Sequence, residues 1–143
     1  MSHDLEKIAS DWIAYARFGS NEAPDQIFAD GWVLYDLVED TPASAWDVIQ
    51  IVVRRFTLLD LYSAEKTEAQ DVVGLTAAGP LEDLISSRGH EYIDFIEEEA
   101  RRDQRMAWTL GGVWQSTTPD DVWARIQAVA DYSYWERPVP NGS

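Results

Sequence analysis

The stretch Thr41-Pro-Ala-Ser-Ala-Trp-Asp-Val-Ile-Gln-Ile-Val-Val-Arg54 decides the fold that we expect for this chain. Thr41 fits the N-cap of a helix, and Pro42 fits the first helical position, where the N–H that proline lacks would have no intrahelical partner. The apolar residues that follow leave only a narrow polar strip. A helix with so little polar surface is typical of the centre of a helical core. The strip consists of Ser44, Asp47, Gln50 and Arg54.

Two helices are predicted before this stretch. Apolar residues recur at spacings of three and four between Leu5 and Ala16, with Ser2 placed to cap the helix and Gly19 to end it. The run Ile27–Val38 is apolar on more than one face. That pattern indicates a second helix, partly buried.

Two helix starts are predicted after residue 76. At Gly79-Pro80, Pro80 fits a first helical position, and Gly89 would end that short helix before a further helix follows directly. At Thr118-Pro119, Thr118 fits an N-cap, and Asp121 fits the reciprocal acid of a capping box.

Two other segments are less regular. Met106–Trp114 predicts a short helix that ends at a pair of glycines. Residues 58–76 leave helix and loop open, and within them Ser63–Val73 favours a short polar helix between loops.

No segment shows sustained alternation of apolar and polar residues, so we predict an all-α fold of about seven helices packed as stacked helical hairpins. A chain of 143 residues is the size of one ordinary domain, which we place at residues 1–136. The tail, residues 137–143, is expected to be flexible.

Two segments of the chain are similar to each other in sequence. Residues 41–52 and 118–129 share Thr, Pro, Trp, Ile, Gln and Val at equivalent places, six of twelve positions. This similarity fits a repeat scaffold with a concave binding face, and it equally fits two buried helices that converged on one cap and one Trp anchor.

Composition excludes several classes of protein. Apolar residues make up 45% and charged residues 26%, as in globular proteins, and no apolar run approaches the roughly 20 residues of a membrane span. Cysteine is absent, so thiolate metal sites and cysteine nucleophiles are excluded. The amino terminus lacks a secretory pattern, and we expect a cytoplasmic protein. The net charge of −15 disfavours nucleic acid and anionic membranes as direct partners.

Motifs for catalysis and cofactors are weak. His90 and Asp94 stand one helical turn apart, which is half of a divalent-metal site without a second placed histidine. Glu97 and Glu98 are expected to pair with Arg101 and Arg102 on a solvated face. The sequence contains no Gly-x-Ser-x-Gly elbow and no phosphate-binding glycine loop. We therefore expect neither an enzyme nor a cofactor, with His90 and Asp94 as the only catalytic candidates.

Seven tryptophans are many for this length. Four of them fall on predicted core stripes, namely Trp12, Trp32, Trp46 and Trp123. The other three, Trp108, Trp114 and Trp135, are candidates for exposed anchors in a partner interface, where tryptophan is enriched.

Acidic residues concentrate at the start of the chain. Residues 1–40 contain nine acids and two bases, a net charge of −7. This acidity fits a solubilising surface, and it also fits a face that steers onto a basic protein, with exposed aromatics fixing the register. The acidic candidates for partner binding are Asp4, Asp11, Asp25, Asp30, Asp36, Glu39 and Asp40.

The segments Ala77-Ala-Gly-Pro-Leu-Glu-Asp-Leu-Ile85, Tyr92-Ile-Asp-Phe-Ile-Glu97 and Leu110-Gly-Gly-Val-Trp114 resemble the core of a family of small, uncharacterised bacterial or phage-associated proteins. The resemblance covers about the last two-thirds of the chain. It implies helices and no activity, and it supplies no catalytic residue to carry over.

Two functions remain for this sequence. The first is a non-catalytic inhibitor, either an immunity protein or a mimic of nucleic acid, that binds a basic toxin, nuclease or nucleic-acid-binding effector. The second is a scaffold or accessory subunit that binds through a hydrophobic face lined by tryptophan.

Overall fold

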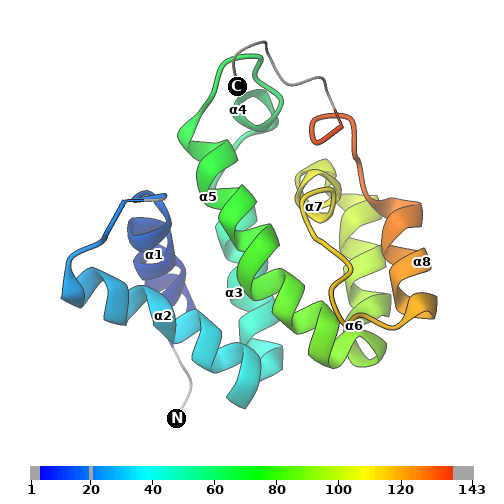
Figure 1. Cartoon of the computed structure of the whole chain (residues 1–143), viewed down its shortest axis with the longest axis horizontal. Coiled ribbons are helices and arrows are strands. Elements are labelled where there is room, and N and C mark those ends of the chain that lie inside the picture. Colours follow the sequence, from blue (N-terminus) through cyan, green and yellow to red (C-terminus); the bar gives the residue numbers. More distant parts are fainter. Residues whose placement is uncertain (1–3, 20, 137–143) are drawn as a thin grey trace.

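The computed structural model describes residues 4–19 and 21–136, and every regular element in these ranges is helical (Figure 1). The prediction of an all-α fold of about seven helices is therefore confirmed, with one four-residue helix and one π-helical turn in addition. The elements are α1 (Leu5–Ala16), α2 (Asp25–Asp40), α3 (Pro42–Arg54), α4 (Leu58–Leu61), α5 (Glu68–Thr76), η1 (Ala77–Leu81), α6 (Glu82–Arg102), α7 (Gln104–Leu110) and α8 (Asp120–Val129).

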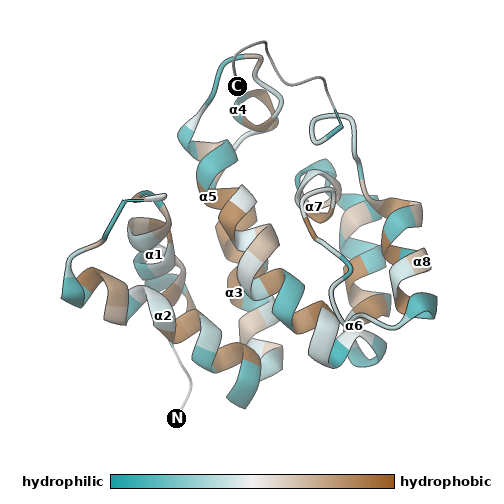
Figure 2. Ribbon diagram, in the orientation of Figure 1, coloured by the Kyte–Doolittle hydropathy of each residue, from teal (hydrophilic) through white to brown (hydrophobic). Residues whose placement is uncertain are grey.

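Helix α3 lies at the centre, as its sequence predicts, and contacts α1, α2, α5, α6 and α7. Six of its apolar side chains are buried, and Figure 2 shows hydrophobic positions gathered on α3 and α5 in the middle of the molecule. Pro42 occupies the first turn. Thr41 stands at the N-cap, but its side chain makes no capping hydrogen bond. The buried residues are Ala45, Trp46, Val48, Ile49, Val52 and Val53.

Helices α1 and α2 pack closely against each other. A Cβ atom at Gly31 would lie 2.4 Å from Cβ of Tyr15, so only glycine allows α2 to approach α1 this far. The predicted cap Ser2 lies outside the described residues, and within them Asp4 caps α1 by accepting a hydrogen bond from the backbone N–H of Lys7 at 3.1 Å.

Residues 58–76, for which the sequence left helix and loop undecided, form two helices, α4 and α5. Helix α5 begins with a capping box between Thr67 and Gln70 and is more buried than a polar helix between loops would be. The side-chain amide of Gln70 donates to the carbonyls of Leu61 and Ser63, which ties the connecting loop to α5. The expected polar helix is wrong in character because its apolar residues face the core, where α5 lies.

The predicted helix start at Gly79-Pro80 is wrong. Pro80 lies inside a continuous helix, in the π-helical turn η1 that joins α5 to α6. A proline in an α-helix lacks one hydrogen bond and clashes with the carbonyl four residues earlier, and the wider turn of a π-helix accommodates the ring. The backbone of Gly79 touches α2, since a Cβ there would lie within 3.2 Å of Cζ of Tyr35.

The predicted break at Gly89 falls within one residue of a kink in α6. Arg88 has non-helical dihedral angles, φ −134° and ψ 23°, and the chain changes direction there (Figure 1). Gly89 is buried against Val122 of α8, which explains the small residue next to the kink.

The predicted capping box at Thr118 is wrong. Pro119 takes the N-cap position of α8 without a side-chain hydrogen bond, and the Thr118 hydroxyl is buried with no partner among the described residues. The two similar segments, residues 41–52 and 118–129, also form helices in different environments. Helix α3 is central, whereas α8 lies at the edge against α6 and α7. Trp46 is buried, whereas its counterpart Trp123 is half-buried.

Candidate interaction surface on α2

The acidic candidates separate into two groups. On α1, Asp4 caps the helix, and Asp11 pairs with Lys7 at 2.6 Å, so both carboxylates serve the local structure. The other five lie on α2, whose 16 residues contain no lysine or arginine. They are Asp25, Asp30, Asp36, Glu39 and Asp40.

Most of the α2 carboxylates have no partner within the protein. Asp30 accepts a hydrogen bond from the side chain of Gln26 at 2.8 Å. The remaining four are exposed, and none makes a side-chain hydrogen bond or an ion pair with any described residue. Figure 2 shows hydrophilic positions at both ends of α2.

Three of these acids stand where the helix disfavours negative charge. Asp36, Glu39 and Asp40 lie in the last five residues of α2, and its last turn has no basic residue. The carbonyl end of a helix carries a partial negative charge, which makes an exposed carboxylate there unfavourable by about 0.3–1 kcal/mol. This end of α2 is therefore less stable than a lysine or arginine would make it.

A row of aromatic rings runs along the same helix, and we call Phe28, Trp32 and Tyr35 the aromatic row; the first two are exposed and Tyr35 is half-buried. The rings of Phe28 and Trp32 stack at 5.0 Å and 21°, and those of Trp32 and Tyr35 lie 4.4 Å apart. Tyr15 of α1 packs edge-on beneath the first two rings. Phe28 is 45% exposed and Trp32 40%.

The prediction that Trp32 is a core residue is wrong, because α2 lies at the edge of the molecule and no described element covers this side of it. The sequence did contain a signal, since positions 28, 32 and 35 follow the spacing of one helical stripe. At about 100° per residue, these rings share an arc of about 100° with Asp25, Asp36 and Glu39. Aromatic rings and carboxylates thus occupy one surface, which we call the α2 face.

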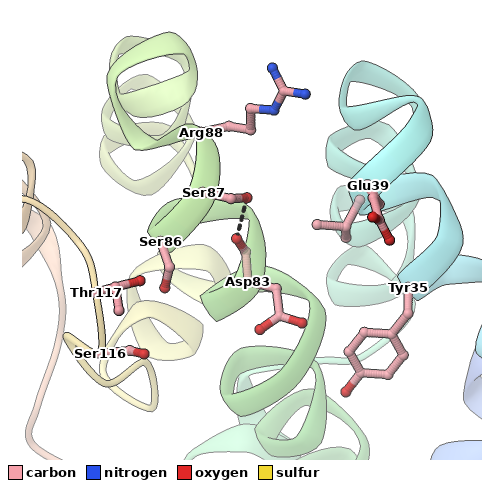
Figure 3. A pocket seen from close by; sticks show the side chains of 9 residues that line it. Tyr35, Glu39, Asp83, Ser86, Ser87, Arg88, Ser116 and Thr117 are labelled. Atoms are coloured by element: carbon pink, nitrogen blue, oxygen red, sulfur yellow. Dashed lines mark hydrogen bonds between the residues drawn. The ribbon is translucent and has the colours of Figure 1, made fainter.

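A cavity of about 520 Å³ lies at the carboxyl end of the α2 face, between α2 and α6. Figure 3 shows Tyr35 and Glu39 on α2, with Asp83 pointing from α6 toward them. The rim consists of Ser86, Ser87, Arg88, Ser116 and Thr117, and Val38 completes the lining.

The polar groups that line the cavity differ in their hydrogen-bond partners and in the direction of their pKa shifts. The hydroxyls of Ser86 and Ser87 donate to the backbone carbonyls of Glu82 and Asp83, respectively, so both have partners. Figure 3 shows the second of these bonds. Partial burial, aided by the neighbouring Glu82, raises the pKa of Asp83 above its ordinary value. Burial, with Asp83 next in effect, raises the pKa of Tyr35 to about 12. The cavity therefore disfavours added negative charge.

A second hollow, of about 360 Å³, lies at the opposite end of the α2 face. Its lining includes Glu22, Asp25, Phe28 and Tyr15. The aromatic row thus runs between two hollows, each of which has a carboxylate and an aromatic wall.

The three tryptophans predicted as exposed anchors behave differently. Trp108 is fully buried, so it is no anchor. Trp135 is half-buried, with its ring 4.7 Å from that of Trp108 and its Nε1 donating to the Trp108 carbonyl at 2.8 Å. Trp114 is 75% exposed, and its backbone N–H donates to Glu82 at 2.9 Å. Of the three, Trp114 alone is exposed, and its role as an anchor stays a prediction.

Two other apolar patches are exposed. A groove between α3 and α6 is lined by Trp46, Tyr92 and Phe95, with Asp47 and Gln50 beside them. Helix α4 exposes Leu58 and Leu59, and Tyr62 follows it.

The histidine considered for metal binding has a different role. His90 Nε2 lies 2.9 Å from Asp121, and this contact lowers the pKa of the Asp121 carboxyl. Asp94 pairs with Arg125 at 2.6 Å. No cluster of three or more metal-ligating side chains occurs in the described ranges, and none of the helices described there is long and apolar enough to cross a membrane.

The expected pairs of Glu97 with Arg101 and of Glu98 with Arg102 are also replaced by other partners. Glu97 binds Arg125 of α8 at 2.5 Å, and this hydrogen bond lowers the pKa of its carboxyl. Arg102 pairs with Glu99, a buried carboxylate that also binds Arg54 of α3.

The fold and this surface define a small all-helical domain with an acidic, aromatic face. The chain belongs to a family of unknown function, DUF6869, whose family model matches residues 19–134. The match includes the whole of α2, and it confirms the expectation of a family without a known activity. No curated protein and no solved structure gives a significant match.

Proposed function

We propose that this protein is a non-catalytic interaction domain that inhibits a basic, nucleic-acid-handling protein by binding it through the α2 face. The observation that carries the proposal is the combination on one helix of unpartnered carboxylates and exposed, stacked aromatic rings. In such a complex, carboxylates occupy a groove that otherwise holds phosphates, as an immunity protein or a mimic of nucleic acid would do. The partner is a toxin, a nuclease or another effector in the cytoplasm.

The distribution of ion pairs supports binding over solubility alone. Arg54 and Arg125 hold three carboxylates of α6 in ion pairs, those of Asp94, Glu97 and Glu99. On α2, acids stand at the unfavourable end of the helix without a base. Proteins tolerate such local conflicts chiefly at functional sites. The charge also speeds encounter with a basic protein and disfavours direct contact with nucleic acid or anionic membranes.

Capture from host lysate tests the proposal. The bait is the tagged protein, the lysate is treated with nuclease, and captured proteins are eluted with rising salt. A variant in which four α2 acids become lysine is expected to lose a basic partner that the wild type retains. Its substitutions are Asp25→Lys, Asp36→Lys, Glu39→Lys and Asp40→Lys.

A matched variant controls for overall charge. It changes four exposed acids outside α2 that make no ion pair with a described residue, so its net charge equals that of the α2 variant. Retained capture by this variant supports the α2 face, whereas equal loss from both variants would show that net charge alone attracts the partner. Its substitutions are Asp60→Lys, Glu65→Lys, Glu98→Lys and Glu136→Lys.

A scaffold or accessory role is the second candidate, and the exposure of Trp114 favours it. In that role the partner binds through hydrophobic surface, so the complex resists high salt and survives the lysine substitutions on α2. The variant Trp114→Ala would then lose the partner, while the wild-type bait keeps it in the same washes.

A further inference from the structure

We propose that the cavity between α2 and α6 receives an arginine side chain of the basic partner. This inference rests on the proposed function, because it names the group that the α2 face recognises. We expect arginine rather than lysine because of the residues that line the cavity.

The cavity combines the two groups that a guanidinium binds best. Tyr35 contributes an aromatic wall from α2, and two carboxylates, Glu39 and Asp83, come from the two helices that form its sides (Figure 3). A guanidinium is flat, stacks on aromatic rings and donates hydrogen bonds to carboxylates in a fixed fork. Lysine carries a compact, strongly hydrated charge that uses only part of this arrangement.

The cavity also lacks an unpaired cation of its own among the described residues. Neither Glu39 nor Asp83 is in an ion pair there. Arg88 is the one base of the lining, and its guanidinium pairs with Glu91 at 3.2 Å. The nearby Glu82 carboxylate accepts the Trp114 N–H. A guanidinium from outside would therefore meet two free carboxylates.

The surroundings of Asp83 make its carboxylate more receptive to a cation than a fully solvated acid would be. The pKa of Asp83 is raised because burial removes water from its charged form. A cation placed next to Asp83 would restore that missing stabilisation. The volume of about 520 Å³ is ample for one long side chain.

The arginine preference is tested with two peptides of equal charge, nona-arginine and nona-lysine. Isothermal titration at moderate salt measures their affinities for the wild-type protein and for Asp83→Asn and Glu39→Gln, with Asp60→Asn as a remote control. We expect nona-arginine to bind about fivefold more tightly to the wild type, and each cavity variant to remove most of that preference. The control should keep it. Urea unfolding of each variant verifies that it is folded.

The outcomes separate the inference from the function on which it rests. Equal affinity of the two peptides for the wild type, or a preference that survives both cavity variants, overturns the arginine site and leaves the basic-partner proposal standing. Failure of both peptides to bind at low salt contradicts both. As a second readout, N-acetyl-arginine amide should shift the backbone NMR signals of Tyr35, Glu39 and Asp83, and shifts confined to other elements would contradict the site.

Discussion

Two carboxylates of α6, Glu97 and Glu99, and two of α2, Glu39 and Asp40, have the same chemistry and opposite surroundings. On α6, Glu99 is 2% exposed and binds two arginines, and Glu97 binds Arg125. On α2, Glu39 and Asp40 are exposed and pair with no base in residues 4–19 and 21–136. The first set joins helices to one another. The second set contributes nothing to packing and lies at the helix end that disfavours it.

This difference separates acids that hold the fold together from acids that are available to a partner. It also explains why a count of charges along the sequence identifies the acidic region and misses the distinction within it. The pairing depends on which helices meet, and Arg54 and Glu99 are 45 positions apart. The predictions that follow test the two sides of this contrast.

The largest expected effect is on the free energy of unfolding, from removing a carboxylate that is paired with arginines. Replacing Glu99 with alanine removes charged hydrogen bonds to Arg54 and Arg102, and leaves a small cavity. Both arginines are partly exposed and can be solvated, so we expect a loss of about 2–3 kcal/mol in the free energy of unfolding. Urea unfolding measures it. The neighbouring exposed residue supplies the control Glu98→Ala, and equal stability of the two variants would refute a structural role for Glu99.

The aromatic row should show a smaller effect on stability and a larger one on binding. Trp32 is 40% exposed, so Trp32→Ala should lower the free energy of unfolding by only about 1 kcal/mol. The same change should weaken nona-arginine about fivefold, since exposed tryptophans often carry interface energy. A large loss of stability with unchanged peptide binding would assign Trp32 to the core instead.

The smallest effect concerns Asp83 and depends on pH. Because its pKa is raised in the folded protein, the protonated carboxyl favours folding. That contribution is fully present below the ordinary value of 3.8 and is lost as the pH rises through the folded-state pKa. Asn resembles the protonated acid, so Asp83→Asn should be slightly more stable than the wild type at pH 7 and equal to it at pH 3. The midpoints of urea unfolding, measured between pH 3 and pH 7, test this prediction. A variant less stable than the wild type at pH 7 would contradict it.

Local signals predicted the helical fold well. The spacing of apolar residues placed α3 and its buried side, and Gly89 placed the kink of α6 to within one residue. These features depend on residues close together in the chain. The predicted start at Pro80 was wrong because the helix continues through Pro80 in a π-helical turn, which the local proline and glycine signals do not reveal.

The candidate surface was predicted only in part. The acids of α2 were identified from their density, but the exposure of Trp32 and the burial of Trp108 depend on which elements cover each helix. Asp83 was missed, since it comes from a segment more than 40 residues away in sequence from Glu39 and meets α2 only in the folded protein (Figure 3). The family match adds no residue roles, because the family has no known function.

The most direct test measures stability and capture on one variant, Glu39→Lys combined with Asp40→Lys. Two lysines at the carboxyl end of α2 replace an unfavourable interaction with the helix dipole by a favourable one, so the free energy of unfolding should rise by about 0.5–1 kcal/mol at low salt. The account predicts that this more stable protein no longer retains the basic partner. A less stable variant that captures the partner as well as the wild type would contradict it.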